Sequence, residues 1–535
     1  MKGIKRLLIL AMTLVPVFGM AACNQAGDGV LTVSFTISGY GSEYVDELVA
    51  AFEEETGIPV EVELDDNATN VNISRIVSTN RNEIDVFFAM VPSFANIDNY
   101  ANQYGYDNLF QKLDDLYAME VPDTGGQTLR DLVRDDLYEA QLTYDPNGGE
   151  GEIYTVPWTT SVEGFIYNQK VLDLYGIDSL PRTTNEFEEV LDIIKSGRTA
   201  DGDIVAPALR AAGITCANNS AYWAFVWPTW WAQYEGLANY ERYFSALPEN
   251  ATSNVPDWHA LDQEGKKIAM EEVSRFIYKE NGYMYEKCED TSNLQSQVDF
   301  FDGKAAFIPS GSWIESETAI DYMNAGVELD YGVMPTPVTS SLGTKLGISE
   351  EELRAAIDYI DGTTDTVPTY AGKDSEMASQ ITERIREARG LVHSGLTDQN
   401  KVYIASYSSE LEEAYQFVLF YASPKAQQIL MKYGILSAFG YSAQDIEETS
   451  DFVKSMDSLL QDENSQLVFT VDKYPICYKA GLTDTAHRTI TSATRTFEKI
   501  LYDGTKSVND LYEEELLYYQ TNWSRMLTAA GYGRS

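Results

Sequence analysis

The stretch from Gly303 to Trp313 contains the residue types that a ligand-contacting loop requires. Ala305 to Ile308 has the apolar run of a short buried strand, and a helix is expected to begin near Glu315. Between them, small residues let a ligand approach the backbone closely, and the first turn of the helix offers free N–H groups. Trp313 adds a flat amphipathic face, so the stretch is a candidate ligand-contacting loop, with a plain strand-to-helix turn and a packed Trp as the alternative. The contact residues predicted here are Ser310, Gly311, Ser312 and Trp313.

A second candidate platform is the aromatic-rich segment at 220–245. A sugar presents apolar C–H faces and a rim of hydroxyls, so its site combines Trp or Tyr platforms with polar side chains at their edges. Trp230 and Trp231 are adjacent in a helical pattern and cannot share a face, so we expect at least one of them to face a cleft or solvent. A buried aromatic core is the alternative for this segment.

The sequence contains no recognisable set of catalytic residues. A glycosidase needs two carboxylates at a fixed separation, but 83 Asp and Glu residues always supply such a pair, so the pattern is uninformative. The three histidines, His259, His393 and His487, form no metal-like cluster, and neither G-x-S-x-G nor H-E-x-x-H occurs. We therefore expect a binding protein that is not an enzyme and that uses no metal and no cofactor.

The N-terminus has the pattern of an export signal. A positively charged start precedes an apolar run over 7–20, and two alanines lead directly to Cys23. The run is short for a membrane span, and small residues before a cysteine resemble a bacterial lipobox. We expect residues 1–22 to be removed, Cys23 to be lipidated, and 23–29 to tether the protein to the extracellular face of the cell membrane. An ordinary signal peptide cut elsewhere and a transmembrane anchor are the alternatives.

Composition narrows the class of protein further. Of the 535 residues, 513 follow the predicted signal of 22, which is too many for one core, so two large lobes are expected. The formal net charge of −45 argues against a nucleic-acid partner and fits an exported surface. After Cys23 only Cys216, Cys288 and Cys477 remain, with no C-x-x-C pair and no zinc spacing. At most one bridge can form, for example Cys216 with Cys288, and buried free thiols are the alternative.

Periodic patterns place these features on an α/β scaffold. Apolar residues alternate over 31–37 and 60–64 and form a helical stripe over 44–52, which predicts a strand–helix–strand unit with parallel strands. Further strands are expected at 84–88, 162–168, 305–308, 331–334 and 402–406. Helices are expected near 71–81, 128–140, 169–175, 184–196, 409–421 and 424–433, with a mostly helical remainder at 445–535.

Six segments occur in an order that resembles a known family. They are Phe52–Ile58 with the strand after it, Ile153–Pro157, Phe165–Asn168, Pro181–Phe187, Phe301–Ala306 with Gly311–Trp313, and Tyr331–Pro335. Behind a lipobox, this ordered set resembles the extracellular solute-binding proteins of bacterial ABC importers, in the carbohydrate-type branch that includes maltose-binding protein. The chain departs from the family in its length, mainly at 339–398 and in the C-terminal region. It also lacks a Gly-Gly run before the strand at 402–406.

The resemblance implies a two-lobed α/β fold of the periplasmic-binding-protein (Venus flytrap) kind, type II, with a helical C-terminal region. By this analogy lobe 1 comprises 29–158 and 338–422, with a surface insertion at 339–398, and lobe 2 comprises 159–337 and 423–535. The chain would cross between the lobes near 158–160, 335–337 and 422–424, with the ligand in the cleft between them. Trp158 then lies beside a crossing segment and the loop of Trp313 faces the cleft. The predicted ligand contacts also include Tyr40 and Ser93.

The function implied by the resemblance is capture of a sugar or oligosaccharide by hinge closure and its delivery to the permease subunits of an ABC transporter. We expect a monomeric lipoprotein whose partners are carbohydrate, permease and membrane surface, and not nucleic acid. Two alternatives stay open: a binding protein for another polar solute, and a surface carbohydrate-binding lipoprotein that serves no importer.

Overall fold

A computed structural model describes residues 29–37, 39–65, 83–90, 109–145, 151–216, 221–251, 253–395, 400–471, 473–482, 489–490 and 496–532. The predicted lipid attachment at Cys23, the helix near 71–81 and the ligand contact at Ser93 lie outside these described residues. Among the described helices, none has both the length and the apolar composition that a membrane span requires.

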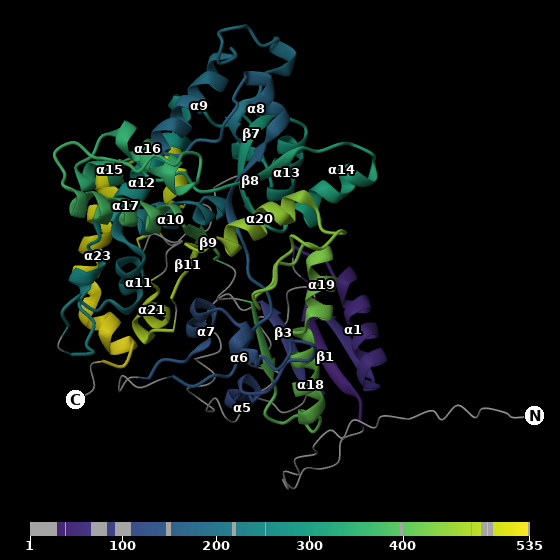
Figure 1. Cartoon of the computed structure of the whole chain (residues 1–535). Coiled ribbons are helices and arrows are strands. Elements are labelled where there is room, and N and C mark those ends of the chain that lie inside the picture. The colour runs from purple at the N-terminus through teal and green to yellow at the C-terminus, as the bar shows by residue number, and fades with distance from the viewer. Residues whose placement is uncertain are drawn as a thin grey trace, which may run out of the picture.

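The first lobe, in the lower half of Figure 1, is built on a sheet that has five strands within the described residues. Its strands are β1 (Leu31–Thr36), β2 (Val60–Asp65), β3 (Val86–Met90), β4 (Val156–Pro157) and β10 (Asn400–Ile404). They lie in the order β2-β1-β3-β10-β4, with β1 parallel to β2 and β3, and β10 antiparallel to β3 and β4. The parallel strand–helix–strand unit predicted at the start of the chain is confirmed.

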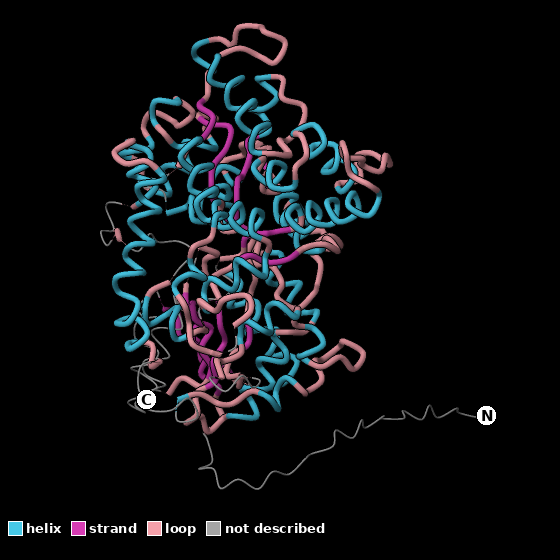
Figure 2. Tube along the Cα trace, turned by 90° about the vertical axis from the view of Figure 1, so that its left-hand side faces the viewer, coloured by secondary structure: helices cyan, strands magenta, loops and turns pink. Residues whose placement is uncertain are grey.

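The second lobe is built on a sheet that lies in the upper half of Figure 1 and has six strands within the described residues. Its strands are β5 (Glu163–Asn168), β6 (Ala212–Ile214), β7 (Ala305–Gly311), β8 (Tyr331–Met334), β9 (Leu391–His393) and β11 (Gln466–Val468). The order is β11-β9-β5-β7-β6, and β8 also pairs with β5. Figure 2 shows the two sheets as separate groups of strands, one in each lobe, so the molecule has the two-lobed α/β fold that the sequence predicts.

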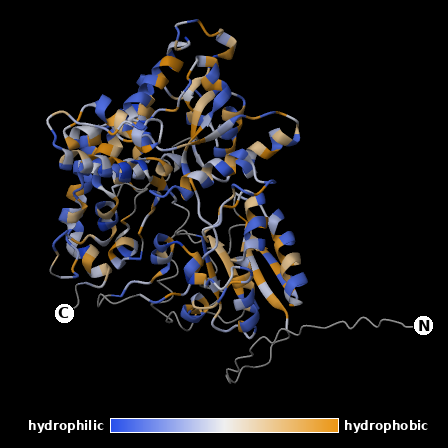
Figure 3. Cartoon of the chain, in the orientation of Figure 1, coloured by the Kyte–Doolittle hydropathy of each residue, from blue (hydrophilic) through white to orange (hydrophobic). Residues whose placement is uncertain are grey.

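Helices cover both sheets with their apolar faces. In the first lobe, Phe52 of α1 meets Phe417 of α18 with ring centroids 4.9 Å apart, and Phe35 of β1 stacks on Phe88 of β3 at 4.6 Å. Figure 3 shows the hydrophobic residues of these strands between helices whose outer faces are hydrophilic. The helices of this lobe are α1 (Glu43–Thr56), α5 (Asp114–Tyr117), α6 (Leu129–Leu132), α7 (Asp135–Gln141), α18 (Leu411–Tyr421) and α19 (Pro424–Lys432).

The second lobe is larger and holds the C-terminal helix. Its α-helices are α8 (Gln169–Tyr175), α9 (Thr184–Ser196), α10 (Trp227–Glu235), α11 (Leu237–Ser245), α12 (Glu264–Ile277), α13 (Asn293–Phe301), α14 (Ile320–Asn324), α15 (Ser341–Leu346), α16 (Glu350–Ile360), α17 (Ser375–Arg389), α20 (Asp451–Gln461), α21 (Pro475–Ala480), α22 (Phe497–Asp503) and α23 (Val508–Ala529). Short helical turns are η1 (Pro207–Leu209), η2 (Ala221–Phe225), η3 (Trp258–Leu261), η4 (Lys279–Asn281), η5 (Cys288–Asp290) and η6 (Glu315–Ala319).

A buried ion pair attaches α23 to the body of this lobe. Lys266 Nζ of α12 lies 3.0 Å from Glu515 Oε2 of α23, and the two side chains are only 3% and 2% exposed. Lys266 also donates to the Tyr243 hydroxyl at 2.8 Å. Because loss of one partner would leave a buried charge unpaired, the C-terminal helix is an integral part of the second lobe.

Residues 339–393 belong to the second lobe, which differs from their expected place as an insertion in lobe 1. After β8 the Val338 N–H donates to the Arg182 carbonyl at 2.8 Å, so the chain stays with the second sheet. Val338 joins Leu353 and Ile385 in a hydrophobic cluster, α15 and α17 pack on α10, and β9 pairs with β5. The chain therefore crosses to the first lobe between β9 and β10, and not at 335–337.

The last crossing lies later than the expected position at 422–424. In the first lobe α19 packs against α1, and Lys432 Nζ lies 2.8 Å from Glu47 Oε2. The next helix, α20, packs instead on β8 of the second sheet, where Phe452 and Tyr331 have centroids 4.8 Å apart. The segment 433–450 therefore carries the chain back to the second lobe.

Candidate ligand site between the lobes

The loops that follow β1 and β7 meet where the two lobes touch. The Tyr40 hydroxyl and Ser312 Oγ are 2.5 Å apart, and both residues are buried. Gly39 lies so close to Trp313 that a Cβ at position 39 would be only 2.7 Å from Trp313 Cβ, so no larger residue fits without movement. The structure thus brings together Tyr40 of the first lobe with Ser312 and Trp313 of the second. All three are ligand contacts predicted from the sequence.

Trp313 is the centre of an aromatic cluster at this boundary. Phe225 meets it edge-on with ring centroids 5.2 Å apart, and Tyr222 lies tilted to it at 6.1 Å. The indole folds back over Gly311, where a Cβ would lie 2.4 Å from Trp313 Cη2, so this conformation of the indole requires glycine there. With 5% of its surface exposed, Trp313 is packed by its own lobe and covered by the other.

A buried Glu–His pair lies beside this cluster. His393 Nδ1 at the end of β9 lies 2.6 Å from Glu163 Oε2 at the start of β5, with side chains 1% and 0% exposed. Ser161 Oγ and the Gly395 N–H also donate to the Glu163 carboxylate, at 2.9 and 3.0 Å. The imidazole faces Phe225 with centroids 6.1 Å apart. Because Nδ1 is committed to the carboxylate, Nε2 is the nitrogen left to meet a ligand.

Four buried polar atoms at strand ends along this boundary have no hydrogen-bond partner within the described ranges. Burying such an atom without a partner costs about 1–3 kcal/mol. Folded proteins therefore usually satisfy buried polar atoms with water or ligand. The four atoms are Thr36 Oγ1 of β1, Asn400 Nδ2 of β10, Ser310 Oγ of β7 and His393 Nε2 of β9.

Burial sets the electrostatics of the site. It raises the pKa of Tyr222 to about 12, and the negative charge of Glu317 acts in the same direction. Burial also raises the pKa of the Glu317 carboxyl, although Gln297 Nε2 donates to it at 2.6 Å. The pKa of Tyr40 is likewise raised by burial, against the opposing effect of its hydrogen bond with Ser312. The phenols therefore stay protonated and able to donate, and the charged groups here are acidic, which suits a neutral hydroxylated ligand better than an anion.

The other tryptophans predicted to contact a ligand, Trp158, Trp230 and Trp231, are buried more deeply than Trp313. Trp158 follows β4, and its indole N–H donates to a backbone carbonyl of β3 at 3.1 Å on the first-lobe side of the boundary. Trp230 and Trp231 are both fully buried inside the second lobe, where their N–H groups reach the Pro337 carbonyl and Gln263 Oε1 at 3.1 and 2.8 Å. The expectation that one of this adjacent pair faces a cleft or solvent is not met, because α10 is covered by α11, α12 and α17.

Sequence reasoning missed Tyr222, Phe225 and the pair of Glu163 with His393 as site residues. The two rings lie in the aromatic-rich segment, but the sequence does not show that η2 ends before the buried helix α10 begins. Glu163 and His393 are 230 positions apart, and nothing in the local pattern of either residue points to the other. Across the described residues no group of three or more His, Cys, Asp or Glu is placed to hold a metal ion.

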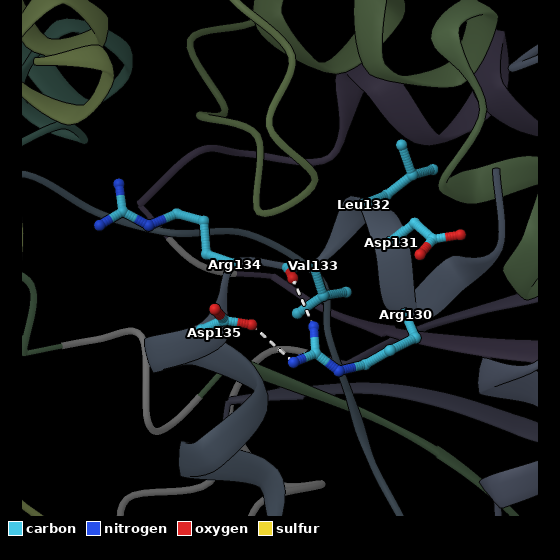
Figure 4. A pocket seen from close by; sticks show the side chains of 6 residues that line it. All are labelled: Arg130, Asp131, Leu132, Val133, Arg134 and Asp135. Carbon is cyan, nitrogen blue, oxygen red and sulfur yellow. Dashed lines mark hydrogen bonds and ion pairs between the residues drawn. The ribbon is translucent and has the colours of Figure 1, made fainter. Parts of the chain in front are cut away.

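A separate pocket of about 640 Å³ lies on the first lobe, lined by residues 130–135 between α6 and α7 (Figure 4). Arg130 makes its contacts within the first lobe, donating to the Val133 carbonyl at 3.1 Å and to Asp135 at 2.6 Å, and its guanidinium lies over the Tyr138 ring. Arg134 points the other way and donates to the Leu460 carbonyl of α20, in the second lobe, at 2.9 Å. The lining side chains are charged or aliphatic and include no aromatic ring, unlike the cluster around Trp313.

Several solved structures share this fold across nearly their whole length. A chitin oligosaccharide binding protein superposes with a TM-score of 0.56 at 15% identity, covering 92% of this chain and 99% of its own. The sugar-binding protein MalE from the phytopathogen Xanthomonas citri gives 0.57 at 14% identity, covering 93% and 98%. A probable secreted solute-binding lipoprotein from Streptomyces coelicolor gives 0.58 at 14% identity, covering 93% and 100%. At sequence identities this low, the structural similarity shows that the proteins share a fold.

The sequence itself identifies the family. No curated protein sequence matches the chain. Residues 38–351, more than half of the chain, match the model of the bacterial extracellular solute-binding proteins, which spans the loop after β1, the Glu163 strand and the Trp313 loop. That family serves ABC-type transport and is associated with sugar binding. The chain belongs to the bacterial extracellular solute-binding protein family, as a transport receptor and not an enzyme.

Proposed function

We propose that the protein captures a neutral sugar or oligosaccharide between its lobes and delivers it to the permease of an ABC importer. The observation that carries the proposal is the aromatic cluster around Trp313. The cluster belongs to the second lobe, and Gly39 and Tyr40 of the first lobe cover it. The apolar face of a pyranose ring stacks on such a surface, and its hydroxyls reach the buried hydroxyl, amide and imidazole groups around it.

The charges of the site favour a neutral ligand. Glu163 is held by His393 and Ser161, and Glu317 is held by Gln297, so both carboxylates are fixed in place. An anionic sugar brought between them would meet like charge in a water-poor site, where the repulsion is strong. Neutral hydroxyls can donate to the same carboxylates, and this complementarity makes a neutral oligosaccharide the best candidate.

Closure of the lobes would retain the ligand. The chain passes between the lobes through 158–162, between β9 and β10, and through 433–450, and such connecting segments absorb hinge motion. The bond between Tyr40 and Ser312 joins the lobes next to Trp313, so this contact forms as the site closes.

Lipid attachment at Cys23 would keep the receptor on the extracellular face of the membrane, close to its permease. The support is the signal-like segment before Cys23 and the structural similarity to a protein described as a secreted lipoprotein. Cys23→Ser should release the protein into the medium or stall its processing, as measured by membrane fractionation and intact mass. Unchanged fractionation and mass would contradict anchoring at Cys23.

The ligand can be identified by titration calorimetry of the mature protein with maltotriose, raffinose, xylotriose, chitotriose and a matched acidic sugar, galacturonate. A neutral oligosaccharide should bind, raise the melting temperature and be recovered intact, because a ligand specific for the folded state stabilises it. Binding of amino acids or peptides in place of every sugar would overturn the carbohydrate assignment. Cleavage of the sugar would contradict the receptor role.

A further inference from the structure

Two cysteines lie next to each other in the second lobe. Cys216 follows β6, Cys288 begins η5, and neither is more than 5% exposed. The Tyr285 N–H donates to the Ile214 carbonyl at 2.7 Å, and the Cys288 N–H donates to the Tyr285 carbonyl at 3.0 Å. A parallel bridge also pairs Ile214 with Met284. The two thiols hydrogen-bond to each other within one hydrophobic cluster, so backbone and side chains both hold the pair together.

The third described cysteine has another environment and serves as an internal comparison. Cys477 in α21 is 1% exposed, and its thiol is placed to donate to the Leu482 carbonyl at 2.7 Å. This partner is a backbone oxygen within the same turn of chain. Cys477 is therefore a buried structural thiol, whereas the other two form a pair.

We propose that Cys216 and Cys288 form a disulfide in the exported protein. Disulfides form and persist outside the cytoplasmic membrane, where this family acts. A disulfide requires two nearby Cβ atoms that point toward each other. The direct contact between the thiols and the hydrogen-bonded backbone beside them provide this arrangement, and the pairing does not depend on which ligand the protein binds.

The oxidation requires a disulfide-bearing partner, either a thiol–disulfide oxidoreductase of the cell envelope or, in vitro, oxidised glutathione. The Cys216 thiol donates to the Cys288 sulfur and lowers the pKa of Cys288, so Cys288 is the thiolate that attacks first. It bonds to one sulfur of the oxidant and releases the other as a thiolate. Cys216 then gives up its proton and attacks the Cys288 sulfur, which releases the second oxidant sulfur. Two protons and two electrons leave the pair, and the oxidant becomes two thiols.

The disulfide would connect the two segments that carry the aromatic cluster around Trp313. Cys216 shortly precedes η2, which carries Tyr222 and Phe225, and Cys288 shortly precedes α13 and β7, which lead to Trp313. Because the bond closes a long loop, it restricts the unfolded chain more than a short loop would. We therefore expect the oxidised protein to melt several degrees higher than the reduced protein.

The test is thiol mapping of the full exported protein, exposed to oxidised glutathione while folding, then denatured and alkylated without reductant. Peptides with Cys216 and Cys288 should be recovered joined, two hydrogen atoms lighter than the separate peptides, whereas Cys477 should be alkylated. After reduction all three should be alkylated. Cys477→Ser should keep the joined peptide, and Cys216→Ser should leave Cys288 open to alkylation.

Alkylation of Cys216 and Cys288 in the wild-type protein after this treatment would overturn the proposal, and this result needs no variant to fold. A bridge from either residue to Cys477 would overturn the pairing. Equal melting temperatures of the oxidised and reduced protein would contradict the expected constraint. A sugar titration of both forms tests the proposed ligand separately, since the joined peptide is detected whether or not any sugar binds.

Discussion

Replacing Gly39 with Ala should hold the lobes apart without disturbing the fold of either. The added Cβ would lie 2.7 Å from Trp313 Cβ and 3.0 Å from Glu317 Oε1, and both of these residues belong to the second lobe. Carbon atoms make favourable contact at about 3.5–4.0 Å. The lobes must therefore separate by roughly 1 Å at this point, or the Trp313 loop must shift by a similar distance.

The magnitude follows from the cost of forcing an extra methyl group into a packed contact, which is about 1–3 kcal/mol. Because the clash exists only where the lobes meet, this cost falls on the closed form. Ligand affinity should then fall by roughly 5- to 150-fold, at about 1.4 kcal/mol for each factor of ten. The melting temperature without ligand should change little, since each lobe retains its own core.

Titration calorimetry with the tightest-binding sugar measures the affinity, and small-angle scattering measures how far the lobes approach when sugar is present. Gly343→Ala, in α15, is the matched control, because its added Cβ would meet no atom closer than the Leu353 side chain at 3.5 Å. The control should bind sugar as the wild type does. If Gly39→Ala bound sugar with wild-type affinity and closed to the wild-type radius, Gly39 and Trp313 would not meet in the ligand-bound form and the reasoning would fail.

Three further substitutions test separate parts of the argument. Trp313→Ala should lower sugar affinity by roughly tenfold or more and, because the indole is 5% exposed, should also lower the free energy of unfolding by about 3–5 kcal/mol. Thermal melting and sugar titration of one sample measure both quantities. If stability fell by this amount and affinity did not change, Trp313 would be a core residue only. Glu317→Gln should raise the melting temperature at neutral pH: burial raises the pKa of the carboxyl, so its charged form costs more in the folded state than in the unfolded state, and stability falls as the pH rises through and above the ordinary carboxyl range. A melting curve of this variant that kept the wild-type pH slope would contradict that sign. Arg134→Ala should weaken sugar binding by removing a contact between the lobes, whereas Arg130→Ala, which removes contacts within the first lobe, should not; equal effects on titration would refute a role of Arg134 in closure.

The elements that could be predicted from the sequence are those fixed by neighbouring residues. The helical stripe over 44–52 is the buried face of α1, and the apolar run at 305–308 is the first part of β7. That strand continues through Ser310 to Gly311, two residues expected in the following loop. The structure also places Tyr40 beside Ser312, two residues that the sequence analysis predicts as ligand contacts. In these cases the period of the apolar residues determines the element, and the family pattern determines which strand ends face the other lobe.

The features that could not be predicted depend on contacts between distant parts of the chain. Residues 339–393 join the second lobe through two backbone bonds at Val338, to Arg182 and Thr184, and through a small hydrophobic cluster, none of which has a local signature. Trp230 and Trp231 are both buried because helices from several parts of the chain surround α10, whereas a single helix in isolation would expose one of them. The contact of Glu163 with His393 requires β5 and β9 to be neighbours in the sheet, which only the complete topology shows.

We propose that ligand binding and lobe closure depend on each other, because the buried polar groups that have no partner among the described residues are divided between the lobes. Thr36 and Asn400 belong to strands of the first lobe, whereas Ser310 and His393 belong to strands of the second. A solute that contacts one lobe leaves the groups of the other unsatisfied when the lobes meet, at a cost of about 1–3 kcal/mol for each group. A hydroxyl-rich solute that spans the boundary satisfies one group on each side, and together these shift the equilibrium toward the closed form by more than about tenfold. The proposed preference for a polyhydroxylated ligand and the proposed closure around it would therefore have the same physical cause.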